Sequence, residues 1–146
     1  MRQSIQNASA KVLEDWSMML VEPFEGSTDE LCNAKDLFIT TINFRGPLCG
    51  EFSIVCRDEF AQEVLSNLVG DSEESEEELR DCLLELINVL GGNLLTECYG
   101  ADLVFDLINP TVSRLDSNSC SLFFDSRTFY FRLDEHPIAL RFSLKE

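Results

Sequence analysis

The sequence predicts an α+β fold, in which helices pack on a largely antiparallel β-sheet of about six strands. Two observations lead to this prediction. Several short segments alternate apolar and polar residues, as half-buried strands do, and three segments repeat apolar residues at helical spacing. Strands interleaved with helices in this way are typical of the α+β class. The chain has 146 residues, so we expect residues 1–146 to form a single domain.

The elements follow from these patterns and from the turn signals between them. The predicted helices are Ser4–Leu20, Asp58–Val69, which Gly70 ends, and Glu76–Glu97. The predicted strands are Leu37–Phe44, Leu48–Cys56, Leu103–Ile108, Ser119–Phe124, Thr128–Leu133 and Ile138–Leu144. Turn signals lie at 109–110, 116–118, 125–126 and 136–137, and the segment Pro23–Lys35 is expected to be irregular.

The charge balance excludes several kinds of partner. The chain has 27 acidic and 11 basic residues, a formal net charge of −16 at pH 7. This charge repels phosphate backbones and anionic lipid head groups, so nucleic acid and membrane surfaces are not expected as partners. The first residues lack the basic flank and apolar run of a signal peptide, and no apolar stretch is long enough to span a bilayer. We therefore expect a cytoplasmic protein.

Six cysteines raise the alternative of a thiol or metal protein. Their positions are Cys32, Cys49, Cys56, Cys82, Cys98 and Cys120. No two of them form a CxxC or similar pair, and His136 is the one histidine of the chain, so a zinc site would need widely scattered ligands. We expect six free thiols and no metal bound by the protein itself.

The predicted helix Glu76–Glu97 has two different faces. Ser75 and Glu78 form a capping box at its start, behind the acidic run Asp71–Glu78. Its apolar residues project to one side and are expected to be buried: Leu79, Leu83, Leu86, Ile87, Leu90 and Leu94.

Asp81, Glu85 and Asn88 stand at i, i+4 and i+7 and line the opposite face, and Gly92 continues the line one turn later. A solvated polar stripe is the simplest interpretation of this face. However, Asn88, Gly91 and Gly92 all weaken a helix interior, and glycine costs about 1 kcal/mol relative to alanine. A carboxylate and a carboxamide one turn apart, beside a patch without side chains, suit insertion into a polar pocket of another protein.

Asp81-x3-Glu85-x2-Asn88, followed by Pro110 after 21 intervening residues, resembles the D/S-x3-E-x2-N … P signature of the CheC/CheX/FliY phosphatases. The family spacing to proline is about one residue longer. The segments Glu85–Asn93 and Asn109–Val112 resemble the E-L-x-N-x-x-x-G and P-P-T-V segments of the family. Upstream, the order Gly46-x3-Gly50-x5-Cys56 matches the first half of CheX.

The resemblance implies a phosphatase that has no nucleophile of its own. In this family the helix docks on the receiver domain of a phosphorylated CheY-like response regulator. By position, Glu85 would pair with the active-site lysine of the receiver, and the carboxamide of Asn88 would orient the water that attacks the aspartyl phosphate. Mg²⁺ would belong to the receiver, so no cofactor of the chain's own is implied. Asp81 would either support docking or simply cap the stripe, and Gly92 is a further candidate for partner contact.

Two further implications concern the number of sites and the assembly. CheC-type members carry a second motif in their first helix, but here Ala10-x3-Glu14-x2-Ser17 lacks the asparagine. One site per chain resembles CheX, whose members form dimers, so a homodimer is expected. The alternative function is a catalytically silent protein of the same fold that binds a receiver or serves as a scaffold. The presence of both Glu85 and Asn88 favours the phosphatase.

Overall fold

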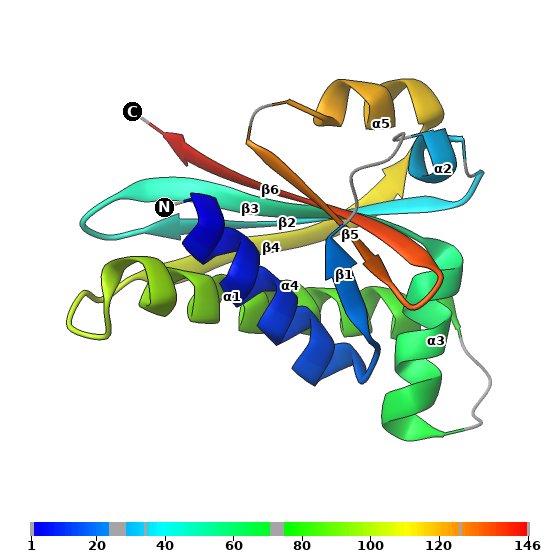
Figure 1. Ribbon diagram of the computed structural model, residues 1–146, viewed down its shortest axis with the longest axis horizontal. Coiled ribbons are helices and arrows are strands. Elements are labelled where there is room, and N and C mark those ends of the chain that lie inside the picture. Colours follow the sequence, from blue (N-terminus) through cyan, green and yellow to red (C-terminus); the bar gives the residue numbers. More distant parts are fainter. Residues whose placement is uncertain (1, 24–28, 34, 71–74, 126, 146) are drawn as a thin grey trace.

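The computed structural model describes residues 2–23, 29–33, 35–70, 75–125 and 127–145. Within these residues the centre is a six-stranded antiparallel sheet in the order β1-β5-β6-β3-β2-β4 (Figure 1). The strands are β1 (Val21–Pro23), β2 (Leu37–Arg45), β3 (Cys49–Arg57), β4 (Asp106–Leu115), β5 (Thr128–Leu133) and β6 (His136–Lys145). The helices are α1 (Arg2–Ser17), α2 (Asp29–Cys32), α3 (Asp58–Val69), α4 (Glu76–Tyr99) and α5 (Ser117–Phe123). The predicted α+β class with a largely antiparallel sheet is confirmed.

Side-chain alternation along the strands creates two hydrophobic clusters, one on each face of the sheet. Phe38 of β2 and Ile54 of β3 belong to the larger cluster, whereas their chain neighbours Leu37 and Val55 belong to the smaller one. Successive side chains of a strand point to opposite faces, so the two clusters lie on opposite sides of the sheet. Helices α1, α3 and α4 cover the larger cluster, and the short helices α2 and α5 lie together over the smaller one (Figure 1).

Helix α4 is the longest helix of the described chain, and its ends follow the sequence signals. The Ser75 hydroxyl accepts a hydrogen bond from the N–H of Glu78 at 3.1 Å, as the N-cap residue of the predicted capping box should. The same hydroxyl donates to the Glu78 carboxylate at 3.3 Å. The helix ends at Gly100, which has φ +87° and donates its N–H to the carbonyl of Thr96. All six residues of the predicted apolar stripe are buried, together with Cys82, Gly91 and Leu95. Residues 71–74 of the predicted acidic run lie outside the described residues.

One predicted strand is wrong. Ser119–Phe124 belongs largely to helix α5, because the Asp116 carboxylate accepts from the N–H of Ser119 at 2.8 Å and caps a helix at that point. The sixth strand of the sheet is instead β1, which lies in a segment with no strand signal. The first predicted helix also ends earlier than expected, at Ser17, and Met18 follows with φ +60°.

The strand predicted at Leu103–Ile108 is shifted along the chain. Observed strand β4 begins at Asp106 and continues through Asn109 and Pro110, where a turn had been expected. Thr41 pairs with Thr111 and Asn43 pairs with Ile108, so two residues of β4 stand opposite the single residue Ile42. This is a β-bulge, and Asn109 has the positive φ of +54° that such irregularities accommodate.

Candidate functional site

The exposed face of α4 carries the site residues that were predicted from the sequence. Asp81, Glu85 and Asn88 are exposed and Gly92 is half-buried, along one line of the helix. Within the described part of the chain, no hydrogen bond or ion pair engages the side chains of Asp81, Glu85 or Asn88. The predicted orientation toward solvent is therefore observed, and these polar groups are available to a partner.

The opposite side of α4 fixes the helix on the sheet. Leu83, Leu86 and Ile87 are at most 1% exposed and pack into the larger cluster. Because both faces belong to one continuous helix, burial of this side sets the direction in which Glu85 and Asn88 point. The exposed stripe thus sits on a rigid support, which is the arrangement that precise positioning of catalytic groups requires.

An ion-pair network holds the first turn of α4. Arg114 of β4 donates to the Glu76 carboxylate at 2.6 Å and pairs with Asp58 of α3 at 2.9 Å. Its guanidinium also lies 3.8 Å from the centre of the Phe38 ring. The hydrogen bond from Arg114 lowers the pKa of the Glu76 carboxyl below its ordinary value. Through this arginine the start of α4 is joined to α3 and to the edge strand.

Strand β4 runs along the flank of α4. Arg80 donates to the carbonyl of Val112 at 2.8 Å. Further along the helix, the side chain of Leu107 packs beside Gly91. The bulge at Asn109 and Pro110 lies between these two contacts. The structure therefore places the proline of the predicted signature beside the middle of α4, the part that carries Glu85 and Asn88.

The two adjacent glycines of α4 have different surroundings. A Cβ on Gly91 would lie 3.2 Å from the Phe52 ring, 3.4 Å from Leu107 and 3.5 Å from Ile42, so Gly91 allows the helix to approach the sheet. A Cβ on Gly92 would meet only Leu107, at 3.8 Å. Of the two glycines that the sequence marks as weakening the helix interior, Gly91 is explained by this packing. Packing does not account for Gly92.

A small groove that the sequence did not reveal continues the exposed stripe. Its volume is about 300 Å³, and it begins at Gly92. Val104, on its wall, is 78% exposed. The full lining is Gly92, Leu95, Thr96, Leu103, Val104, Phe105 and Leu107. No Lys, Arg or His occurs from Asp81 to Ser113, so the stripe and the groove present no basic side chain.

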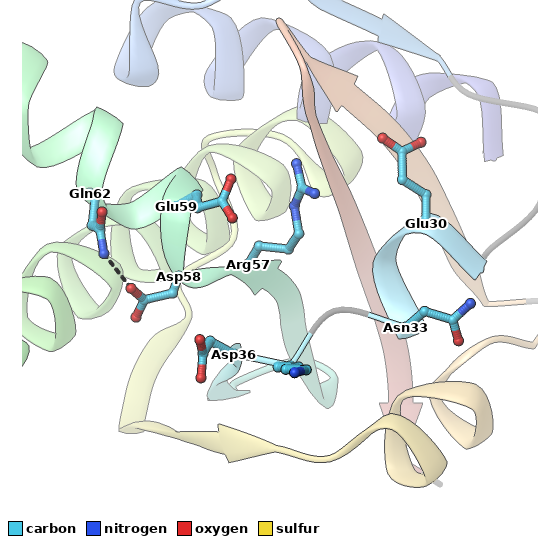
Figure 2. Close-up of a pocket in the computed structure, with 8 residues that line it drawn as sticks. Glu30, Asn33, Asp36, Arg57, Asp58, Glu59 and Gln62 are labelled. Atoms are coloured by element: carbon cyan, nitrogen blue, oxygen red, sulfur yellow. Dashed lines mark hydrogen bonds between the residues drawn. The ribbon is translucent and has the colours of Figure 1, made fainter.

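A larger cavity lies away from these residues. Figure 2 shows it between α2, on one side, and the end of β3 with the start of α3, on the other. It measures about 620 Å³ and is lined by Glu30, Asn33, Lys35, Asp36, Arg57, Asp58, Glu59 and Gln62. Several of its charges already have partners: Glu30 pairs with Arg132 and Asp58 with Arg114. None of the predicted site residues lines this cavity, so the α4 stripe remains the candidate site.

The histidine and cysteines give no metal-binding cluster in the described residues. No group of three or more His, Cys, Asp or Glu side chains is arranged there to hold a metal ion. His136 instead contacts the Glu63 carboxylate through Nε2.

No helix of the described chain is long and apolar enough to cross a membrane.

Comparison with known structures supports the fold. The crystal structure of the chemotaxis protein CheX from Vibrio vulnificus has a TM-score of 0.72 and 16% identity, over 98% of this chain and 95% of that one. CheX from Desulfovibrio desulfuricans has a TM-score of 0.71 and 14% identity, over 98% and 97% of the two chains. A chain of the CheX–CheY–BeF₃–Mg²⁺ complex from Borrelia burgdorferi has a TM-score of 0.66 and 19% identity, over 99% and 97%. At these identities the likeness establishes the fold.

Family membership comes from the sequence. No curated protein matches the chain. The family model described as chemotaxis phosphatase CheX matches residues 38–121, which is more than half of the chain and includes the whole exposed stripe of α4. The chain therefore belongs to the CheX family of chemotaxis phosphatases.

Proposed function

We propose that this protein hydrolyses the aspartyl phosphate of a CheY-like response regulator, with Glu85 and Asn88 entering the active site of the regulator. The observation that carries the proposal is the exposed face of α4. Among the described residues, Glu85 and Asn88 stand there without side-chain partners, on a helix whose other face is buried. A CheX chain from Borrelia burgdorferi forms a complex with CheY, which supports a receiver as the partner. Residues 1–146 would act as one phosphatase domain.

The two side chains have separate tasks. The Glu85 carboxylate pairs with the receiver lysine and fixes the docked geometry. The Asn88 carboxamide holds a water in line with the bond between phosphorus and the aspartyl oxygen. The water oxygen bonds to phosphorus as that bond breaks, which releases inorganic phosphate and restores the receiver carboxylate. Positioning and electrostatics of this kind supply most of the catalysis in phosphoryl transfer.

The metal in this reaction belongs to the partner. The Borrelia complex includes Mg²⁺ and BeF₃, and we assign Mg²⁺ to the receiver and no cofactor to this chain. When bound, Mg²⁺ neutralises charge on the phosphoryl oxygens. The acidic and apolar surface of α4 complements a receiver surface that presents a lysine.

Asp81 and Gly92 complete the proposed docking surface. Asp81 lies one turn before Glu85, where it either contacts the receiver or caps the stripe. The fold has room for a side chain at Gly92, so packing does not require glycine there. A bare backbone one turn beyond Asn88 lets the receiver approach the helix closely.

The protein is further proposed to be a cytoplasmic homodimer. Strand β4 has one open edge, and open edges pair readily with a second chain. Sedimentation at micromolar concentration checks the dimer, and a monomer there contradicts it. The catalytic proposal does not depend on the result, since each chain carries its own α4.

The decisive experiment measures the decay of phosphorylated CheY-like receivers with and without the protein. Asn88→Ala should slow the accelerated decay about 10²- to 10³-fold, by analogy with the loss of one preorganised hydrogen-bonding group. The variant should fold as well as the parent, because Asn88 is exposed and alanine is the better helix former. Asn93→Ala is the matched control: the same change on the same helix, at an exposed residue whose amide already donates to the carbonyl of Val89.

A second variant separates docking from water positioning. Glu85→Ala should weaken both receiver binding and turnover, whereas Asn88→Ala should retain binding. If Asn88→Ala dephosphorylates every responsive receiver at the parental rate, Asn88 does not orient the water. If the parent protein binds phosphorylated receivers without accelerating their decay, the silent receiver-binding alternative is correct.

A further inference from the structure

The face of the sheet opposite α4 contains two cysteines in direct contact. The Sγ atoms of Cys32 in α2 and Cys120 in α5 lie 2.7 Å apart, although the residues are 88 positions apart in the chain. Both thiols are buried, with exposed fractions of 3% and 0%. Nothing in the proposed dephosphorylation uses this pair.

The fold brings the two thiols together through two short helices. The Asp116 cap starts α5 so that Cys120 and Phe123, three residues apart, both face the sheet. Leu31 and Cys32 of α2 enter the same cluster, and α2 lies beside α5 in Figure 1. The contact is therefore part of a packed cluster and not a chance approach of two surface side chains.

We propose that Cys32 and Cys120 form a peroxide-sensitive oxidation site, at which the two thiols become a disulfide that links α2 to α5. One sulfur attacks an oxygen of hydrogen peroxide, the O–O bond breaks, and a sulfenic acid and one water form. The second sulfur then attacks the sulfenic sulfur, the S–S bond forms, and the S–O bond breaks to release a second water. The two thiols lose two electrons in total and the peroxide gains them.

Burial of the two thiols favours a small oxidant, and their direct contact favours a disulfide between these two cysteines. A buried site admits a small peroxide more readily than a bulky disulfide reagent. The second thiol already touches the first, so it traps the sulfenic acid before further oxidation occurs. Burial raises the pKa of the Cys120 thiol, and the contact with Cys32 raises it further. The reaction should therefore be slow at neutral pH and faster as the pH rises, because the thiolate is the nucleophile.

The linked form should resist unfolding more than the reduced form. A cross-link between residues 32 and 120 closes a long loop, which reduces the conformational entropy of the unfolded chain. From that loop length we expect the Tm to rise by about 10 °C. Dithiothreitol should reverse the rise.

The test uses the full chain, treated with hydrogen peroxide, then denatured and alkylated with N-ethylmaleimide. We expect the loss of three of the six alkylation sites, Cys49 through added oxygen and Cys32 and Cys120 through the cross-link. Digestion without reductant should then give one cross-linked peptide that joins Cys32 to Cys120. Exposed Cys49 reports that the oxidant was active, because it should gain oxygen in the same sample. Retention of alkylatable Cys32 and Cys120 at alkaline pH, where their oxidation is expected to be fast, overturns the proposal if Cys49 is oxidised in the same sample, as does a cross-link through any other cysteine.

Variants extend the test to stability. Cys120→Ala should remove both the cross-link and the peroxide-dependent rise in Tm, whereas Cys49→Ala and Cys98→Ala should keep them. A rise in Tm that persists in Cys120→Ala contradicts the assignment. Peptide mapping uses the parent protein, which carries no substitution, so the proposal remains testable if Cys120→Ala fails to fold.

Discussion

The face of the sheet under α1, α3 and α4 differs from the face under α2 and α5 in the size of its hydrophobic cluster and in its proposed function. Among the described residues, the first face contributes 27 buried residues to its cluster and the second contributes seven. Burial of apolar area is the main source of folding free energy, so most of the stability resides on the α4 face. That same face supports the exposed stripe proposed for catalysis. The smaller face holds the cysteine pair and has no part in the proposed reaction.

Helix α4 shows what this division means for the protein. Its inward side chains hold the fold together, and Asp81, Glu85 and Asn88 on its outward side have no side-chain partner among the described residues. Loss of an inward residue should therefore affect stability, and loss of Glu85 or Asn88 should affect activity. The following predictions test the contrast between the two faces, and then between the two sides of α4.

Truncation of one leucine on each face should give the largest difference in stability. Leu83→Ala on α4 should cost about 3–5 kcal/mol, because the surrounding cluster is too extensive to close the cavity. Leu31→Ala on α2 should cost about 2–3 kcal/mol, because a four-residue helix over a small cluster settles more easily. Both leucines are at most 1% exposed, so the pair is matched for burial. Urea unfolding measures both values, and equal costs would remove the distinction between the faces.

Alanine at the two neighbouring glycines of α4 should change stability in opposite directions. Gly91→Ala should destabilise by about 1 kcal/mol or more, because its Cβ meets Phe52 and Ile42, which are buried and unable to move freely. Gly92→Ala should stabilise by up to about 1 kcal/mol through helix propensity. If Gly92 lies against the receiver, Gly92→Ala should also raise the receiver concentration needed for half-maximal rate. Thermal unfolding and receiver titration provide the two measurements, and the same sign of stability change for both variants would refute the packing argument.

The smallest effect concerns an ion pair beside α5. Arg127 donates hydrogen bonds to the Asp125 carboxylate and lowers its pKa to about 2. Because the folded pKa lies below the ordinary value of about 4, the stabilisation is fully present above that pH and is lost as the pH falls toward 2. Arg127→Ala should raise the pKa of Asp125 toward its ordinary value and cost little stability, since the pair is partly exposed.

An NMR titration of the side-chain carboxyls measures this pKa. Asp116 is the internal control, because the hydrogen bond from the Ser119 backbone lowers its pKa and the Arg127 substitution leaves that bond intact. An unchanged Asp125 titration in Arg127→Ala would show that Arg127 is not the cause of the low pKa.

The same contrast explains how much the sequence could predict. On the α4 face, long helices display several turns of apolar spacing, and capping signals such as Ser75 and Gly70 mark where they begin and end. On the other face, α2 has four residues and β1 only three, which is too short for any period to appear. At α5 the sequence pattern indicated a strand over Ser119–Phe124, yet Leu122 is 82% exposed while Cys120 and Phe123 are buried. The Asp116 cap was the signal that could have identified the helix.

Part of the candidate site could likewise be predicted from the sequence, and part could not. The spacing of Asp81, Glu85 and Asn88 placed all three on one exposed face, because helix geometry converts sequence spacing into direction. The groove beside Gly92 could not be predicted, because it depends on how residues 103–105 pass over the end of α4 before β4 begins. The need for glycine at position 91 could not be predicted either, since it depends on a contact with a strand distant in the sequence.

The bulge at Asn109 and Pro110 affects how the protein behaves at high concentration. Strand β4 is an outer strand of ten residues, and a regular open strand of that length would be a template for successive addition of further chains. The bulge divides it into the short stretches 106–108 and 111–115, and Pro110 has no N–H to offer a foreign strand. Neither stretch provides the long uninterrupted ladder that fibrillar aggregation needs. The irregularity beside the proposed catalytic residues thus limits strand addition at this edge to short stretches, which is compatible with one partner chain and disfavours a growing fibre.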